Sequence, residues 1–239
     1  MQALILAGGL GTRLRAVVSD KPKPMATIVG KPFLEYQIEL LQRGGVDDVT
    51  FCVGYLYEQI QNYFGSGEKW GVKINYSIEE ELLGTAGALK LAQRFIHGPF
   101  FVLNGDTHLD IDLPKLARFY QENKENHNAI GAMALAEIQD ARNYGSVTIN
   151  ADSAILSFNE KSESAETSKL INAGIYVLAP EILNFIAAAK KVSLEKETFP
   201  TAINQGHPLF GYRTEGYFVD IGTPAGYQGF QQHISGKDA

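Results

Sequence analysis

A glycine-rich segment near the N-terminus, residues 6–14, has the composition of a loop that binds phosphate groups. It reads LAGGLGTRL and follows a short apolar run. Glycines let backbone N–H groups approach a bound anion closely, and Arg13 adds a rigid fork of donors. The segment is neither a dinucleotide fingerprint, which needs a third glycine at Leu14, nor a P-loop, which needs GKS or GKT. On its own, a plain tight turn explains the glycines about equally well.

A second segment, DKPKPM at residues 20–25, combines a lysine with a restricted backbone, and GKP follows at residues 30–32. The prolines on either side of Lys23 hold the lysine ammonium in one place. A cation held in this way suits the charge that develops on a phosphoryl group during transfer. Taken alone, this motif favours a proline-rich surface turn with solvated lysines.

The elements that must position these segments follow from the hydrophobic pattern. In the first half we expect strands at 3–7, 48–53, 72–78 and 100–103, alternating with helices at 32–45, 57–64 and 85–96. This alternation predicts an α/β, Rossmann-like, mostly parallel twisted sheet with helices on both faces. In such sheets ligands bind beyond the carboxyl ends of the strands, and the glycine-rich segment lies at such an end.

The regularity changes after residue 112. We expect helices at 113–125, 180–188, about 194–204 and from Pro224 onward, and strands at 129–136, 146–150, 154–158, 172–178, 209–213 and 217–220. These elements predict an extension of the same sheet that builds one wall of a cleft, within a single domain over residues 1–239.

Composition narrows the class of protein. The chain has 239 residues, 45% of them hydrophobic, and a net charge of −6, which argues against a nucleic-acid partner held by phosphate neutralisation. Residues 1–43 carry six Lys and Arg against three Asp and Glu, a net +3 that indicates a local anion site. The single cysteine, Cys52, excludes an intramolecular disulfide and is expected in the core. Without a basic N-terminal region or a long apolar run, we expect a cytoplasmic protein with no membrane partner.

The order of GGLGTRL, KPKPM and GKP closely resembles the N-terminal signature of the sugar-1-phosphate nucleotidyltransferases, or nucleotide-sugar pyrophosphorylases, which use a nucleoside triphosphate (NTP). The resemblance covers almost the whole chain and implies the nucleotide-diphospho-sugar transferase type of fold. It implies that the glycine loop wraps the triphosphate, that Arg13 contacts its β/γ end, and that Lys23 stabilises the reacting α-phosphate. By this resemblance Arg13 and Lys23 are catalytic, and the nucleotide-binding residues are Leu6, Ala7, Gly8, Gly9, Gly11, Thr12, Arg13, Lys23, Glu79, Gly84, Thr85, Asn104 and Asp106.

Residues 79–89, EEELLGTAGAL, resemble the second nucleotide loop of that family, in which Glu79 would read the base. A carboxylate can accept from N1–H and the 2-amino group of guanine together, whereas uracil and thymine offer one donor flanked by acceptors. This chemistry favours GTP. Glu80 or Glu81, instead of Glu79, is an alternative for the residue that contacts the base. Three consecutive acids are also typical of a solvent-exposed segment that precedes a helix.

Asp106, in LNGD, and Asp220, in FVDIGTP, resemble the two carboxylates that bind the catalytic Mg²⁺ in this family. Two carboxylates together with phosphate oxygens and waters make a shell that suits Mg²⁺. A structural role for Asp106, capping the turn that follows its strand, is the alternative.

Three short segments resemble the positions that bind the sugar in this family: YG at 144–145, EK at 160–161 and NAGIY at 172–176. By this resemblance the sugar-phosphate-binding residues are Tyr144, Gly145, Glu160, Lys161 and Asn172. Among them, Lys161 would bind the sugar phosphate, and Glu160, Asn172 and the Gly145 backbone would bind sugar hydroxyls. The resemblance thus implies a nucleotide-binding half over about 1–112 and a sugar-binding half over about 113–235.

The implied reaction is nucleotidyl transfer, in which a sugar 1-phosphate attacks the α-phosphorus of an NTP and pyrophosphate leaves. Within the family, VVSDKPKPM, GKPFLEY and YSIEEELLGTAGAL are most similar to the D-glycero-D-manno-heptose 1-phosphate guanylyltransferases of bacterial surface-glycan synthesis. Mannose-1-phosphate guanylyltransferases, uridylyltransferases of other sugar phosphates and a catalytically silent regulatory paralogue are the alternatives. The glycan concerned (lipopolysaccharide, capsule or S-layer) and the oligomeric state, a homo-oligomer included, stay open.

Overall fold

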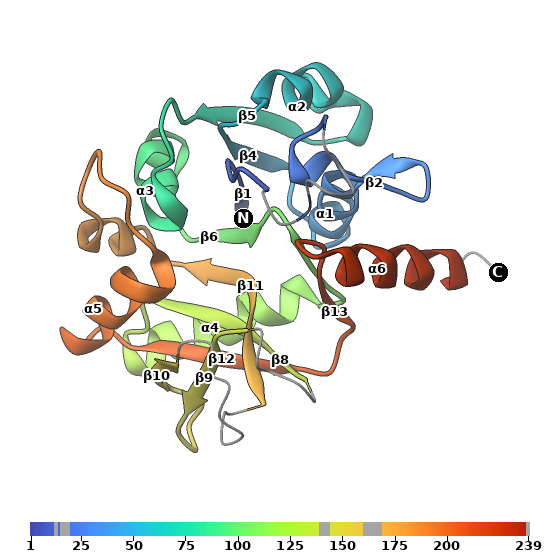
Figure 1. The fold of residues 1–239 in the computed structure, drawn as a ribbon. Coiled ribbons are helices and arrows are strands. Elements are labelled where there is room, and N and C mark those ends of the chain that lie inside the picture. Colours follow the sequence, from blue (N-terminus) through green and yellow to red (C-terminus); the bar gives the residue numbers. More distant parts are fainter. Residues whose placement is uncertain (12–13, 15–19, 139–143, 160–168, 238–239) are drawn as a thin grey trace.

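The computed structural model describes residues 1–11, 14, 20–138, 144–159 and 169–237, and it confirms the predicted α/β class (Figure 1). The elements of the first half are β1 (Gln2–Ala7), α1 (Phe33–Arg43), β4 (Asp48–Val53), α2 (Tyr57–Phe64), β5 (Lys73–Ile78), α3 (Gly84–Leu91) and β6 (Phe100–Asn104). Strands β6, β1, β4 and β5 are neighbours in that order and run parallel. The chain therefore leaves β1 and β6 at the same edge of the sheet.

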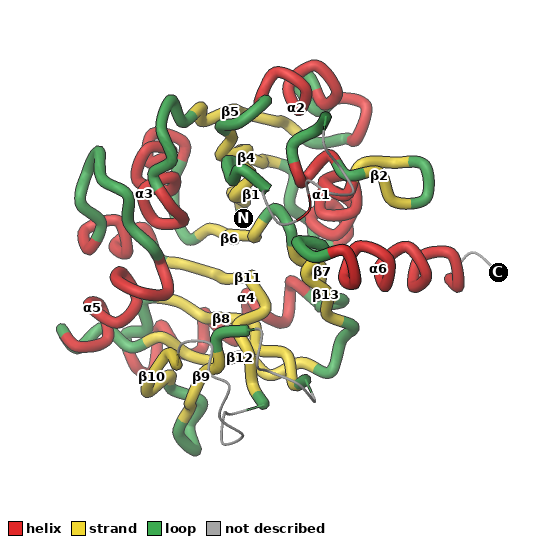
Figure 2. The backbone as a smooth tube through the Cα atoms, in the orientation of Figure 1, coloured by secondary structure: helices red, strands yellow, loops and turns green. Residues whose placement is uncertain are grey.

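The second half extends the same sheet, as predicted. Its elements are β7 (Thr107–Leu109), α4 (Leu113–His127), β8 (Gly131–Glu137), β9 (Ser146–Ile149), β10 (Ile155–Asn159), β11 (Leu170–Leu178), α5 (Phe199–Asn204), β12 (Leu209–Thr214), β13 (Phe218–Asp220) and α6 (Pro224–Lys237). Strand β11 pairs antiparallel with β6, and β8 and β9 pair antiparallel with β11. Strand β10 pairs antiparallel with β9 and β12 pairs parallel with β8, which completes a sheet of nine strands. Figure 2 shows these strands in one column, with α3 and α5 on one side and α1 on the other.

Several short elements lie between the long ones. They are η2 (Lys23–Met25), β2 (Thr27–Ile28), β3 (Lys31–Pro32), η3 (Glu68–Trp70), η4 (Ala92–Phe95), η5 (Pro180–Phe185) and η6 (Leu194–Thr198). Two predicted helices differ in detail, because the segment 180–188 forms only the 3-10 helix η5 and the segment 194–204 begins with the π-helical turn η6. Strand β7 was not expected, since three residues are too few for an alternating pattern to be visible.

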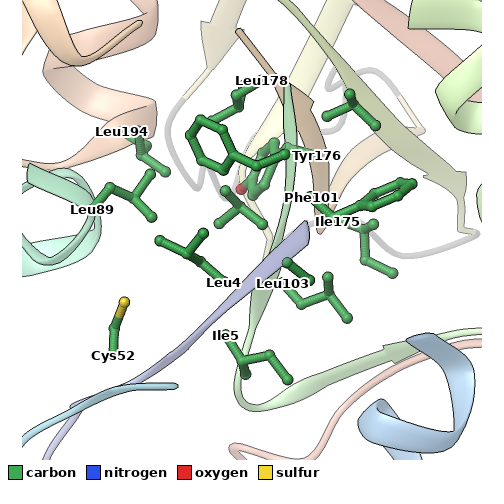
Figure 3. Packing of buried hydrophobic residues seen from close by; sticks show 14 of the residues in the cluster. Leu4, Ile5, Cys52, Leu89, Phe101, Leu103, Ile175, Tyr176, Leu178 and Leu194 are labelled. Atoms are coloured by element: carbon green, nitrogen blue, oxygen red, sulfur yellow. The ribbon is translucent and has the colours of Figure 1, made fainter. Parts of the chain in front are cut away.

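The core forms around the central strands. Leu4 and Ile5 of β1 are fully buried, as expected of a parallel strand covered on both faces. Figure 3 shows these side chains packed with residues of β6 and β11, and Cys52 lies at the same cluster. The predicted core position of Cys52 is confirmed, and burial raises the pKa of its thiol.

A second, smaller core holds the C-terminal helix α6 against the N-terminal half. Phe230 packs edge-to-face against Phe33 and Tyr36 of α1, with ring centroids 5.4 and 5.3 Å apart. The Tyr227 hydroxyl donates to the carbonyl of Thr27 at 2.7 Å, and Figure 1 shows α6 beside this β2 hairpin. Because α6 directly follows β13, this packing fixes where the residues after Asp220 lie.

No helix in the described part of the chain is both long and apolar enough to cross a lipid bilayer.

Candidate active site

A cavity of about 410 Å³ opens beyond the carboxyl ends of β1 and β6. Its lining consists of Leu6, Ala7, Gly8, Gly9, Gly11, Lys23, Pro24, Glu79, Leu82, Gly84, Thr85, Ala88, Asn104, Gly105, Asp106 and Lys191. Every predicted nucleotide-binding residue that the structure describes is in this set. The predicted residues Thr12, Arg13, Glu160 and Lys161 lie outside the described residues. The volume is within the usual range for a small-molecule site.

Two glycines bring the loop after β1 into contact with other parts of this cavity. A Cβ on Gly8 would collide with the carboxylate of Glu79, so a larger residue there would force the Glu79 side chain to move. Gly11 has a φ of +60°, and a Cβ on it would lie 2.9 Å from the Cβ of Lys23. The glycines therefore serve close approach to two side chains of the site, in addition to leaving backbone N–H groups accessible.

Lys23, Asp106 and Asp220 meet at one end of the cavity. The Nζ of Lys23 lies 2.5 Å from Oδ2 of Asp106 and 3.7 Å from Oδ1 of Asp220, and the lysine side chain is only 10% exposed. Lys23 and Asp106 are 83 positions apart in the sequence, and Asp106 and Asp220 are 114 positions apart, so the fold alone brings the three residues together. The structure thus brings both predicted aspartates to the same lysine ammonium.

The strands β7 and β13 explain how the two aspartates meet. They form a separate two-stranded ribbon in which Asp220 lies opposite Thr107, and the N–H of Ile221 donates to the carbonyl of Asp106 at 2.9 Å. Asp220 also accepts from the N–H of Gly222 at 2.6 Å, and a Cβ on Gly222 would collide with the Nζ of Lys23. The small ribbon and this glycine thus bring a lysine and two carboxylates to one point.

A buried glutamine holds the turn that carries Asp106. The Nε2 of Gln37 donates to the carbonyl oxygens of Asn104 at 2.6 Å and Thr107 at 2.9 Å, which flank that turn. Gln37, on α1, is 1% exposed. The residues around it in the sequence indicate only a helix and no functional motif. Sequence reasoning missed it because its two partners lie 67 and 70 residues away.

The two aspartates fit a divalent cation of the magnesium type. They already share one cation, the Lys23 ammonium, and carboxylate oxygens are the ligands that Mg²⁺ prefers. Within the described ranges, no three His, Cys, Asp or Glu side chains are placed to hold a metal ion. Oxygen atoms from a substrate or water would therefore have to complete the shell, which is consistent with a metal that arrives with a phosphate.

The three consecutive acids after β5 separate in the structure. Glu79 is 8% exposed and lines the cavity, whereas Glu80 and Glu81 are exposed. Burial raises the pKa of the Glu79 carboxyl, and the N–H of Leu83, which donates to its Oε2 at 3.0 Å, offsets part of that rise. Of the three acids, Glu79 alone presents its carboxylate to the 410 Å³ cavity.

The described residues predicted for the sugar side lie next to one another beside the cavity. The N–H of Asn172, on β11, donates to the carbonyl of Gly145 at 3.4 Å. Tyr144 packs edge-to-face on Phe218 of β13, two residues before Asp220, with centroids 5.5 Å apart. Tyr144, Gly145 and Asn172 do not belong to the lining of the 410 Å³ cavity.

Lys191 lines the cavity and was missed by sequence reasoning. It lies in an irregular segment before η6 that pairs with the start of α3: the N–H of Val192 donates to the carbonyl of Leu83 at 2.9 Å, and the N–H of Ala86 donates to the carbonyl of Val192 at 3.0 Å. Gly84, with a φ of +73°, makes this approach feasible, since a Cβ there would lie 2.5 Å from the carbonyl oxygen of Val192. No motif marks Lys191, because its place depends on a pairing about a hundred residues away in sequence.

Comparisons with known proteins show the family of this chain. A family model described as nucleotidyl transferase matches residues 2–236. The D-glycero-alpha-D-manno-heptose 1-phosphate guanylyltransferase of Campylobacter jejuni subsp. jejuni serotype O:2 is 42% identical over 96% of this chain and 98% of that protein. A mannose-1-phosphate guanyltransferase of Candida albicans is 37% identical over 94% of this chain and 62% of that protein.

A solved structure shows the same relationship. The crystal structure of HddC from Yersinia pseudotuberculosis, complexed with GMP-PN, has a TM-score of 0.83 and 32% identity to this chain, and covers 98% of this chain and 99% of its own. The family model spans nearly all of the sequence, and the fold and the order of the motifs agree with it. The chain therefore belongs to the nucleotidyl transferase family, which confirms the resemblance that its motifs indicated.

Proposed function

We propose that this enzyme is a sugar-1-phosphate guanylyltransferase that uses GTP and D-glycero-D-manno-heptose 1-phosphate. An oxygen of the sugar phosphate attacks the α-phosphorus of GTP in line. The bond from the α-phosphorus to the α,β-bridging oxygen breaks, and the bond electrons leave with pyrophosphate. The products are a GDP-sugar and pyrophosphate. We further infer a cytoplasmic enzyme of surface-glycan synthesis.

The observation that carries this proposal is the meeting of Lys23 with Asp106 and Asp220 at the end of a cavity walled by a glycine loop. A phosphate monoester is already an anionic nucleophile, so the reaction needs no strong general base. What it needs is a fixed geometry for two polyanions and cations that offset their repulsion. A buried ammonium and two carboxylates for a cation are what such a reaction requires.

The residues of the chain divide this work. Backbone N–H groups of the loop after β1 bind the triphosphate, and Lys23 donates to the α-phosphate. Arg13 and Lys161 neutralise the triphosphate and the sugar phosphate, as the motifs predict. Asp106 and Asp220 would hold Mg²⁺, which when bound screens the phosphate charges and polarises the α-phosphorus.

The choice of guanine rests on Glu79. Its carboxylate lines the cavity and has oxygens for both N1–H and the 2-amino group of the base. The solved relative with 32% identity contains GMP-PN, and the GMP portion of that molecule carries guanine. Both observations support GTP over a pyrimidine nucleotide.

The sugar is proposed from the relatives. The relative with 42% identity over nearly both full lengths carries the name of a heptose 1-phosphate guanylyltransferase, which favours that sugar. Mannose 1-phosphate is the second candidate, because the mannose-1-phosphate guanyltransferase of Candida albicans is 37% identical. In either case Tyr144, Gly145 and Asn172, in the half from about 113 to 235, would contact the sugar.

The test is a matrix of GTP, UTP, CTP, ATP and dTTP against heptose, mannose, glucose and N-acetylated hexose 1-phosphates, scored by pyrophosphate release. We expect the highest kcat/KM for GTP with heptose 1-phosphate. Activity with UTP or dTTP alone would contradict the guanine assignment. Absence of activity in every combination would contradict the enzymatic proposal and favour a silent paralogue.

A further inference from the structure

A chain of side-chain hydrogen bonds runs beside the cavity from α3 to β11, and Glu195 of η6 is at its centre. Its Oε2 accepts from the hydroxyls of Thr85 at 3.2 Å and Ser193 at 2.8 Å. Its Oε1 accepts from the hydroxyl of Tyr176 at 3.0 Å. One carboxylate thus joins a residue of the first half of the chain to a residue of the second.

Tyr176 carries the connection onward. Its hydroxyl accepts from Nδ2 of Asn172 at 2.7 Å, and the side chain of Asn104 also bonds to it. Because amide N–H groups occupy its lone pairs, the phenol proton points to Glu195. Tyr176 is completely buried among the core side chains of Figure 3, and burial and the charge of Glu195 raise its pKa, so the phenol stays a neutral donor.

The ends of this network are groups that face substrate under the proposed function. Thr85 and Asn104 line the cavity, whereas Glu195 and Tyr176 do not. The Thr85 hydroxyl also accepts from the N–H of Leu194 at 2.8 Å, so both its donor and one lone pair are committed. The network therefore fixes how that hydroxyl is presented to the cavity.

The amide of Asn172 is fixed in the same way. Its Oδ1 accepts from the N–H of Gly174 at 2.9 Å while its Nδ2 donates to Tyr176. Turning the amide over would break both bonds. Gly174, with a φ of +72°, lies in the irregular part of β11 between Asn172 and Tyr176, where the pairing register with β8 shifts.

We propose that Glu195 is a positioning residue that ties the nucleotide half of the site to the sugar half, acting through Thr85 on one side and through Tyr176 and Asn172 on the other. This inference rests on the proposed function. In this role Glu195 contacts neither substrate. Its effect comes from fixing the positions of two groups that face the substrates, Thr85 and Asn172, relative to each other. The backbone pairing between Val192 and α3 keeps η6, and with it Glu195, against the nucleotide loop.

The experiment compares Glu195→Gln with Tyr176→Phe and with the control Glu197→Gln. The amide introduced by Glu195→Gln retains one acceptor oxygen for three hydroxyl donors, so one end of the network is lost. Glu197 lies on the same helical turn and is exposed, and its Oε1 accepts only from the N–H of Ser193 among the contacts described for it. KM for GTP, KM for the sugar 1-phosphate, kcat and Tm are measured for each variant.

We expect Glu195→Gln to raise both KM values about tenfold, as the loss of a hydrogen bond to a charged group predicts, with kcat within about threefold of wild type. Tyr176→Phe should raise KM for the sugar 1-phosphate more than KM for GTP, because Thr85 keeps its bond to Glu195. Glu197→Gln should leave both KM values unchanged. A purely structural role for Glu195 would lower Tm without changing KM.

Unchanged KM values in Glu195→Gln, or a rise in one KM alone, would overturn the inference while leaving the proposed function intact. A wild-type chain that releases no pyrophosphate with any substrate pair would contradict the proposed function and this inference with it. Wild-type turnover measured first separates the two results.

Discussion

Glu79 is the residue on which the proposed choice of base depends. Replacing it with glutamine keeps one acceptor and turns the other oxygen into a donor, which faces a donor of guanine but matches an acceptor of uracil. We expect Glu79→Gln to raise KM for GTP about tenfold or more and to improve kcat/KM for UTP relative to GTP.

The control for this change is Glu80→Gln, an exposed neighbour outside the 410 Å³ cavity. Kinetics with both nucleotides check the prediction. If Glu79→Gln kept the wild-type ratio of GTP to UTP, or if Glu80→Gln changed it equally, Glu79 would not be the base reader.

The burial of Glu79 also has a consequence for stability. Its folded pKa is raised by burial, so its contribution to stability is fully present below the unfolded pKa and is lost as pH rises through the folded pKa. Glu79→Gln removes the cost of keeping a buried carboxylate ionised. The Tm of this variant relative to wild type should therefore increase as the pH rises above the ordinary pKa of a glutamate, about 4.3. A Tm difference independent of pH would show that Glu79 is solvated like Glu80.

At the scale of secondary-structure elements, the turn between β6 and β7 holds Asp106, one of the two proposed metal ligands. The amide of Gln37 holds both carbonyl oxygens beside Asp106, and its own Oε1 has no partner among the described residues. Gln37→Met keeps the volume and removes the donors. We expect a loss of about 2 kcal/mol in the free energy of unfolding, because two buried carbonyl groups lose a donor.

The same variant should need more Mg²⁺ for half-maximal activity, since Asp106 would be held less firmly. Urea unfolding and a Mg²⁺ titration at saturating substrates measure the two effects. A matched control is Gln42→Met at the C-terminal end of the same helix, far along α1 from that turn. A Mg²⁺ requirement unchanged in Gln37→Met would mean that the turn keeps its shape without the amide.

The sequence predicts those helices and strands that have a clear local pattern of apolar and polar residues. The alternation of apolar runs with glycines and prolines placed β1, α1, β4 and the final helix closely, because each is long enough for its periodicity to show. It could not predict β7, whose three residues form a strand only through pairing with β13. The ribbon that joins Asp106 to Asp220 is thus a product of tertiary contacts.

On the scale of the whole molecule, one sheet carries both halves of the site. Strand β11 pairs with β6, so Asn172 on β11 and Asp106 after β6 lie on adjoining parts of one framework. The segment 1–43, with its net charge of +3, supplies Lys23 and the glycine loop, and the acidic remainder supplies both aspartates. An overall charge of −6 is therefore compatible with binding polyanions, because Lys23 and Lys191 line the cavity in which phosphate is expected.

The candidate site could be predicted to the extent that motifs encode it. The eleven described nucleotide-binding residues chosen from motifs all line one cavity. Lys191, Gln37 and Glu195 could not be found in this way, because each depends on contacts between residues dozens of positions apart. Their roles follow from packing, which a single sequence does not display.

The most direct test of the central claim is the rate of GDP-heptose formation from GTP and D-glycero-D-manno-heptose 1-phosphate by wild type and Lys23→Ala. Lys31→Ala is the control, since Lys31 pairs with Glu39 outside the cavity. We predict that Lys23→Ala lowers kcat by about 100-fold or more while Tm stays close to that of the control, because the α-phosphate loses its fixed cation. Product formation by Lys23→Ala at the wild-type rate would contradict the assignment of this cluster as the centre of nucleotidyl transfer.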